Sequence, residues 1–139
     1  MVCTFFGHKQ LLCNIESSLE KAILNMVNVN KVYTFYVGNN GLFDCLVQKT
    51  LCKLALNGLN IKYYVILSRV NEVAIGGEQD KTLFPEELEH SLPRFAINKR
   101  NFWLINNSHY VIAYVRDKYS NSYKWKQKAL NKGLSVINI

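Results

Sequence analysis

The chain has 139 residues, of which 49% are hydrophobic and 19% are charged, so we expect one domain with a single core rather than a disordered chain. It contains no apolar run of the roughly 18 residues that a membrane helix needs and no basic leader of the kind that opens a signal peptide, so we expect a cytoplasmic protein without a membrane partner. The net charge of +7 favours anionic partners in general.

The cysteines and histidines form no pattern typical of a metal site. The cysteines lack the C-x-x-C spacing of zinc sites and the density of a secreted disulfide scaffold, so we expect reduced thiols in or near the core; they are Cys3, Cys13, Cys45 and Cys52. His90 and His109 have no partners at ligand spacing. We therefore predict no metal and no cofactor.

The first part of the chain alternates between strand-like and helix-like segments. Val2–Phe6 and Val32–Val37 are runs of β-forming residues that predict the first two strands. Between them, apolar residues recur every three or four positions, which predicts an amphipathic helix. The capping-box spacing of Ser17 and Glu20 places its start between Asn14 and Ser17.

The middle of the chain continues this pattern and then loses it. A second amphipathic helix begins near Phe43 and ends at Asn57-Gly58, because glycine commonly closes helices. Ile61–Leu67 predicts the third strand. Ser68–Pro93 is irregular, and we predict a long loop that carries a short helical turn.

The last third returns to alternating elements. We predict, in order, a helix over Ala96–Asn107, a strand over Tyr110–Val115, a polar break over Arg116–Ser122, a helix that ends near Lys132-Gly133, and a strand over Ser135–Ile139.

This order of elements predicts an α/β fold. Alternating strands and helices imply right-handed β-α-β crossovers and a mostly parallel sheet, so we expect one Rossmann-like three-layer sandwich over residues 1–139, with about five mostly parallel strands and helices on both faces. Ligands of such folds bind beyond the carboxyl ends of the strands, where the strand order reverses. For the order 3-2-1-4-5, three loops meet there: Gly7–Lys9, Gly38–Asp44 and Arg116–Ser122.

The loop Gly38-Asn39-Asn40-Gly41 carries the clearest local pattern for ligand binding. A strand that ends in two glycines and opens a helix allows close approach to the backbone and points N–H groups at an anion. The loop lacks G-x-G-x-x-G spacing and a P-loop lysine, and it equally suits a plain tight turn. Asp44 lies in the first turn of the following helix, where a carboxylate stabilises the positive end of the helix dipole. It is equally suited to accept a hydrogen bond from a ribose hydroxyl.

Two further segments carry groups that suit a phosphate. In Gly7-His8-Lys9, His8 can donate a hydrogen bond and Lys9 can neutralise a phosphate, although a solvated turn is an equal explanation. The guanidinium fork of Arg100 suits bidentate phosphate binding. The competing interpretation pairs Arg100 with the acidic region Glu86–Glu89.

The C-terminal quarter is the most basic part of the chain. Its cations face a single acid, Asp117, and are Arg116, Lys118, Lys124, Lys126, Lys128 and Lys132. This pattern is typical of a solvated helix face. Because Tyr119, Tyr123 and Trp125 lie among the cations, it also suits single-stranded nucleic acid.

Four segments together resemble one known family. Cys3–Lys9 is similar to an opening T-G-H-R strand and loop, and Gly38–Asp44 is similar to G-G-A-x-G-x-D. Lys99–Asn101 with Ser108–Ile112 is similar to R-N-x-x-M followed by S-D, and Lys132–Ile137 is similar to K-G-I-P-V-I. In these features the chain resembles the YpsA-like branch of the SLOG superfamily, Rossmann-like domains that also include DprA and the Lonely Guy phosphoribohydrolases.

The resemblance implies a site for a nucleotide or a nucleotide-derived ligand, and it implies a homo-oligomer. Phe102, Trp103 and Trp125 are candidate interface residues, although we expect at least one of the tryptophans to pack in the core instead. The family's ligand positions fall on Gly7, His8, Lys9, Gly38, Asn39, Gly41, Asp44 and Arg100. Neighbouring polar residues complete the candidate site: Asn40, Asn101, Ser120, Asn121 and Ser122.

One departure from the family weighs against catalysis. This chain has Ser120-Asn121-Ser122 where many members have a G-G-T loop, and Trp125 stands where the Lonely Guy enzymes have the glutamate that assists N-glycosidic cleavage. General acid–base catalysis then lacks its group, whereas the serines and the asparagine still suit a phosphate. The alternative, a nucleotide N-glycoside hydrolase, requires a carboxylate from the long loop: Glu78, Asp80 or Glu86.

Overall fold

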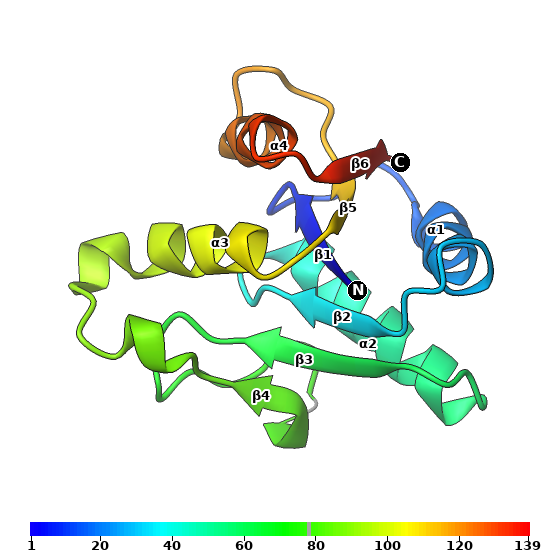
Figure 1. The fold of residues 1–139 in the computed structure, drawn as a ribbon, viewed down its shortest axis with the longest axis horizontal. Coiled ribbons are helices and arrows are strands. Elements are labelled where there is room, and N and C mark those ends of the chain that lie inside the picture. The colour runs from blue at the N-terminus through cyan, green and yellow to red at the C-terminus, as the bar shows by residue number, and fades with distance from the viewer. Residues whose placement is uncertain (78) are drawn as a thin grey trace.

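A parallel sheet forms the centre of the molecule. The structure is a computed structural model, and it describes residues 1–77 and 79–139. In these residues the strands are β1 (Val2–Gly7), β2 (Thr34–Val37), β3 (Lys62–Ile66), β4 (Thr82–Leu83), β5 (Tyr110–Tyr114) and β6 (Ser135–Asn138). Their order in the sheet is β4-β3-β2-β1-β5-β6, and every neighbouring pair is parallel (Figure 1). The predicted Rossmann-like α/β fold class is confirmed.

Helices connect these strands as crossovers. The α-helices of the described ranges are α1 (Glu16–Asn28), α2 (Leu42–Leu56), α3 (Ala96–Asn106) and α4 (Asn121–Asn131). The segment Ser68–Pro93, predicted as a long loop with a short helical turn, contains the 3-10 turns η1 (Gln79–Lys81) and η2 (Glu86–Leu88) and, in addition, the strand β4. A further 3-10 turn, η3 (Pro93–Phe95), begins at its last residue.

The strand count is the one error in the predicted sheet. The five predicted strands are β1, β2, β3, β5 and β6, and their order is the expected one. The sixth, β4, adds to the edge of the sheet by pairing Thr82 with Val65 and Leu83 with Ile66. Two residues are too few to show an alternating apolar pattern, so the sequence could not reveal this strand.

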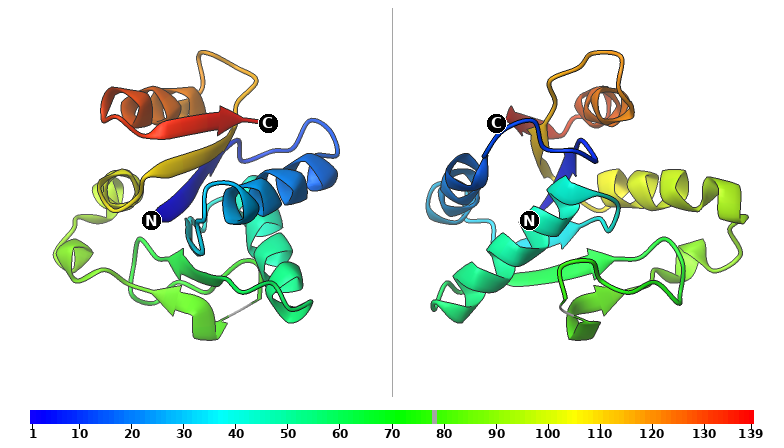
Figure 2. Two further views of the ribbon diagram at one scale, coloured as in Figure 1. Left: turned by 45° about the vertical axis from the view of Figure 1, so that its right-hand side comes forward. Right: turned by 180° about the vertical axis from the view of Figure 1, so that it is seen from behind.

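The alternating direction of strand side chains builds a separate core on each face of the sheet. Phe5 of β1 packs in the cluster that contains Leu19 of α1 and Leu51 of α2, whereas the next residue, Phe6, packs in the cluster that contains Leu104 of α3 and Trp125 of α4. The two pairs of helices therefore lie on opposite faces, as the left view of Figure 2 shows. This is the expected three-layer arrangement.

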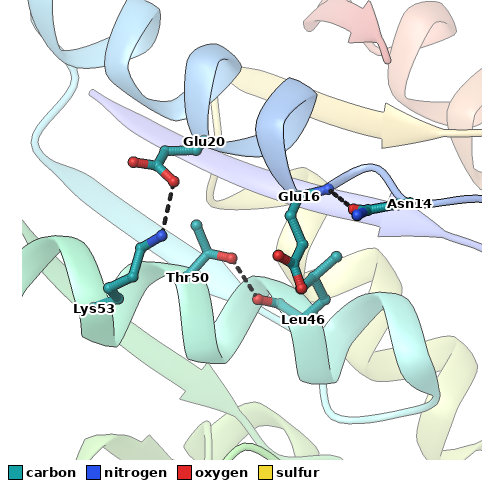
Figure 3. A network of polar contacts seen from close by, with 6 residues as sticks. All are labelled: Asn14, Glu16, Glu20, Leu46, Thr50 and Lys53. Carbon is teal, nitrogen blue, oxygen red and sulfur yellow. Dashed lines mark hydrogen bonds and ion pairs between the residues drawn. The ribbon is translucent and has the colours of Figure 1, made fainter.

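The start of α1 differs in detail from the prediction. The helix begins at Glu16, within the predicted interval, but no side chain caps it. Ser17 already lies inside the helix and therefore cannot act as its N-cap, so the capping-box prediction is wrong. Instead, Oδ1 of Asn14 accepts a hydrogen bond from the Glu16 N–H at 3.0 Å, and Glu20 forms a 2.9 Å ion pair with Lys53 that ties α1 to α2 (Figure 3).

The predicted helix ends agree with the structure. Gly58 follows the end of α2 with a φ of 98°, and Gly133 follows the end of α4 with a φ of 95°. In this backbone region glycine has no steric penalty. Each glycine therefore stops its helix and turns the chain toward the next strand.

Candidate functional site

A cavity of about 490 Å³ opens at the carboxyl ends of the central strands. Its walls come from the ends of β1 and β2, from η3 and α3, and from the first turn of α4. Because β1 lies between β2 and β5, this is the point where the chain changes from building one half of the sheet to building the other. Parallel α/β sheets bind ligands at such points, and the cavity has the size of an ordinary small-molecule site.

The cavity brings together most of the residues that sequence reasoning selected. Those that line it are Gly7, His8, Lys9, Gly38, Asn40, Asp44, Arg100, Asn101, Ser120, Asn121 and Ser122. Segments that lie more than 100 residues apart in the chain thus share one surface. Asn39 and Gly41 do not line the cavity, and each has a structural role that explains why.

Asn39 turns its side chain away from the cavity and holds the loop that follows β3. Its amide nitrogen donates to a carboxylate oxygen of Glu72 and to the backbone oxygen of Val73, each at 3.0 Å. Its amide oxygen accepts from the backbone N–H of Ile75 at 2.9 Å and from the side chain of Gln48 at 3.1 Å. Asn39 therefore fixes the position of Glu72 and does not itself face a ligand.

Gly41 lets the two glycine-bearing loops approach each other. Its φ of 114° lies in the region that side chains disfavour, and a Cβ at this position would lie 2.6 Å from the Cα of Lys9. The N–H of Leu42 donates to the backbone oxygen of Lys9 at 2.8 Å. Glycine is therefore needed here for the close packing of the loops, which holds Lys9 at the cavity.

Asp44 lies in the first turn of α2 with only 9% of its surface exposed. Its Oδ2 accepts a hydrogen bond from the backbone N–H of Asn40 at 2.9 Å. Burial raises the pKa of Asp44 to about 6, and the nearby Arg100 and the Asn40 N–H partly oppose this rise. Asp44 is thus a buried carboxylate that changes its charge at a mildly acidic pH.

Arg100 enters the cavity from α3 with only 2% of its surface exposed. Nε donates to Oδ1 of Asn101 at 3.0 Å and Nη1 donates to the backbone oxygen of Ile66 at 3.2 Å. Burial lowers the pKa of Arg100, while Asp44 and Glu72 oppose this change. These two acids, rather than the region Glu86–Glu89, are its electrostatic partners, so the competing sequence interpretation is wrong.

One side of the Arg100 guanidinium has no acceptor within the described ranges. The hydrogen bonds above use Nε and Nη1 and leave Nη2 without a partner. Nη2 is also not among the fully enclosed polar atoms that lack a partner, so it keeps some accessible surface on a residue that lines the cavity. An anchored guanidinium with free N–H groups is ready to bind an anion.

His8 joins the loop after β1 to the loop after β5. Its Nε2 accepts a hydrogen bond from the backbone N–H of Arg116 at 2.8 Å, and its ring meets the ring of Tyr114 edge-on at 5.4 Å. An accepting Nε2 requires the neutral ring with its proton on Nδ1. His8 therefore positions the loop that leads to α4.

The first turn of α4 presents unpaired backbone N–H groups. Ser120 is the N-cap, and its hydroxyl oxygen accepts from the N–H of Tyr123 at 3.1 Å. The N–H groups of Asn121 and Ser122 precede the first intrahelical bond and have no acceptor among the described residues. Because both residues line the cavity, the positive end of the helix dipole faces it as well.

Sequence reasoning missed the apolar wall and part of the rim. Phe5, Phe6, Leu104 and Ile97 line the cavity, and so does Trp125. These residues carry the ordinary apolar pattern of strands and helices, so nothing in the sequence separates them from other core positions. Arg94 and Asn98 also line the cavity. Asn98 directly precedes the selected segment Lys99-Arg100-Asn101, and this position next to Arg100 was the one feature of the sequence that pointed to it.

Two of the three carboxylates proposed for a hydrolase do not line this cavity. Asp80 lies in η1 and Glu86 in η2, and neither lines it, while Glu78 lies outside the described residues. Asp44 is the one carboxylate of the described lining. Trp125 lines the cavity as well.

The aromatic residues of the basic C-terminal quarter do not share one surface. Trp125 is only 6% exposed and belongs to the core between the sheet and α4, where Tyr123 packs against it. Tyr119 is 86% exposed. Of the three aromatic residues in this quarter, Tyr119 alone is exposed, which gives little support to binding through stacking on them.

Comparisons of the sequence with models of known protein families and with curated proteins found no match. In the described ranges, no helix combines the length and the apolar character needed to cross a membrane.

The pKa of Asp44 generates a prediction about stability. Because this pKa is about 6 in the folded protein and near 3.8 ordinarily, the folded state binds a proton that the unfolded chain releases at lower pH. Wild type should therefore lose stability as the pH rises from about 4 to about 6, by up to about 3 kcal/mol. Asp44→Asn, which cannot titrate, should lack this loss.

The measurement is the free energy of unfolding from urea titrations at several pH values in this window, for wild type and for Asp44→Asn. The difference between the two proteins isolates Asp44 from the other carboxylates. A difference that stays constant with pH, or that shows wild type gaining stability as the pH rises, would contradict the raised pKa.

Proposed function

We propose that this cavity binds or senses a nucleotide or a nucleotide-derived ligand, in the manner of a SLOG-like domain. The observation that carries the proposal is the meeting, in one cavity, of the open Nη2 side of Arg100 and the unpaired N–H groups at the start of α4. Both groups attract anions, and neither has an acceptor in the described part of the chain.

The arrangement of charges favours one orientation of the ligand. At the start of α2, the Asn40 N–H is bonded to the Asp44 carboxylate and the Leu42 N–H to the Lys9 oxygen. A phosphate there would meet a carboxylate and few free donors. At the start of α4 the donors are free, and no acid occupies the helix terminus. The phosphate therefore fits best at α4, within reach of Arg100.

The opposite end of the cavity suits hydroxyl groups. Asp44 offers a carboxylate oxygen that accepts hydrogen bonds, and Asn40 and Asn101 lie beside it in the lining. A sugar hydroxyl can donate to the carboxylate and so replace the water that would otherwise solvate it. A phosphorylated ribose thus matches the cavity at both ends.

Calorimetric titration with nucleoside mono- and diphosphates, ADP-ribose and cyclic nucleotides tests the proposal. We expect at least one to bind, and Arg100→Lys to weaken that binding at least about tenfold, since lysine cannot keep two anchoring bonds and still offer a planar donor pair. Arg69→Lys is the matched control, because Arg69 lies outside this cavity and bonds the backbone of Pro93. Failure of every compound to bind wild type would refute the proposal.

A substitution at the start of α4 tests the role of the backbone. Asn121→Pro removes one N–H from the anion site, yet proline suits the first helical position and the preceding Ser120 already has the extended φ of −83° and ψ of 162° that it requires. We expect the helix to persist and the affinity for the phosphorylated ligand to fall about tenfold. Asn121→Ala keeps the N–H and serves as the control. Equal affinities of the two variants would show that this N–H does not bind the phosphate.

A further inference from the structure

The indole N–H of Trp125 is a polar group of the cavity wall that has no hydrogen-bond acceptor among the described residues. Trp125 lines the cavity and is almost entirely buried. Its interactions in the described residues are ring contacts with Phe6, Phe102 and Lys128, and none involves its N–H as a hydrogen-bond donor. A buried tryptophan ordinarily finds an acceptor for this group.

The indole N–H is nevertheless not sealed in the core. Among the described side chains, the fully enclosed polar atoms without a partner are the hydroxyls of Ser91 and Ser108. The indole nitrogen is not one of them, so it keeps an accessible surface, and the cavity is where Trp125 meets open space. The second tryptophan differs, because Nε1 of Trp103 donates to Glu87 at 2.6 Å.

Three neighbours of Trp125 contact its ring. The ring of Phe6 stacks against it with centroids 6.2 Å apart, and the ring of Phe102 meets it at 82° with centroids 4.9 Å apart. The ammonium of Lys128 lies 5.5 Å from its centroid. These three contacts hold the indole ring in place, and none of them uses its N–H.

Helix geometry places Trp125 close to the proposed phosphate site. Trp125 lies four residues after Asn121 and three after Ser122, so all three share one face of α4. Side chains of a helix lean toward its N-terminus, so the indole covers the first turn, where the free N–H groups of Asn121 and Ser122 face the cavity.

We propose that Trp125 is a ligand-binding residue whose indole N–H donates a hydrogen bond to a phosphate oxygen held at the start of α4. This role rests on the proposed function and extends it by assigning a side-chain donor to the phosphate. The indole also makes the site selective for an anion over a neutral or cationic group, because its edge is the positive part of the ring. Trp125 binds through this edge and does not stack on a base.

The two tryptophans make the proposal directly measurable. Each gives one indole signal in an ¹H–¹⁵N correlation spectrum, and Trp103→Phe and Trp125→Phe assign them. With pyrophosphate and with AMP at millimolar concentration as probes, we expect the indole signal of Trp125 to shift saturably together with the backbone amides of Asn121 and Ser122. The indole signal of Trp103, which is bonded to Glu87, should not move.

Affinity provides the second readout. Trp125→Phe keeps an aromatic ring for packing on Phe6 but lacks the donor, so we expect about tenfold weaker binding of AMP. Trp103→Phe should bind AMP like wild type. If the amides of α4 shift while the Trp125 indole signal stays in place, the role of Trp125 is refuted and the proposed function stands. If neither probe moves the amides or the indole, the phosphate site at the start of α4 and the role of Trp125 are refuted, and the proposed function is decided by the titrations with the full set of compounds.

Discussion

A pair of buried opposite charges at the end of β2 is the interaction on which the site depends. Asp44 and Arg100 both approach the position that a side chain at Gly38 would take: a Cβ there would lie 2.7 Å from Oδ2 of Asp44 and 3.4 Å from Cζ of Arg100. Each charge is costly to bury alone, and each offsets part of the burial of the other. Asp44 belongs to α2 and Arg100 to α3, so this electrostatic interaction joins helices that pack on opposite faces of the sheet.

This pair also makes the cavity asymmetric. Asp44 satisfies the Asn40 N–H and places a carboxylate at the start of α2, whereas the N–H groups of Asn121 and Ser122 at the start of α4 are free. Arg100 lines the same cavity, with two donors anchored on Asn101 and Ile66. Asn39 supports it indirectly by holding Glu72, the second acid that acts on Arg100. A ligand that carries hydroxyls at one end and a phosphate at the other matches this arrangement, because the hydroxyls meet the acceptor at Asp44 and the phosphate meets the free donors at α4.

Much of the fold and of the cavity lining could be predicted from the sequence, because both follow from local patterns. Buried strands such as β1 and β5 are short apolar runs, and parallel strands necessarily bring their carboxyl ends to one edge. That rule placed Lys9, Asp44 and Ser122 in one cavity before any coordinates. Features that depend on distant partners could not be predicted in this way.

Three features of the structure depend on such distant partners. The direction of the Asn39 side chain depends on acceptors more than 30 residues away in the chain. The strand β4 exists only because Val65 and Ile66 are available to pair with it. Trp125 has the same apolar spacing whether its N–H is sealed in the core or open to a cavity, and only the packing of Phe6 and Phe102 distinguishes these cases.

The most direct test of the central claim is a crystal structure of the protein grown with ADP-ribose or AMP. We expect phosphate density between the guanidinium of Arg100 and the first turn of α4, with a ribose hydroxyl on Asp44. A ligand bound outside this cavity, or a cavity closed by its own side chains, would contradict the claim.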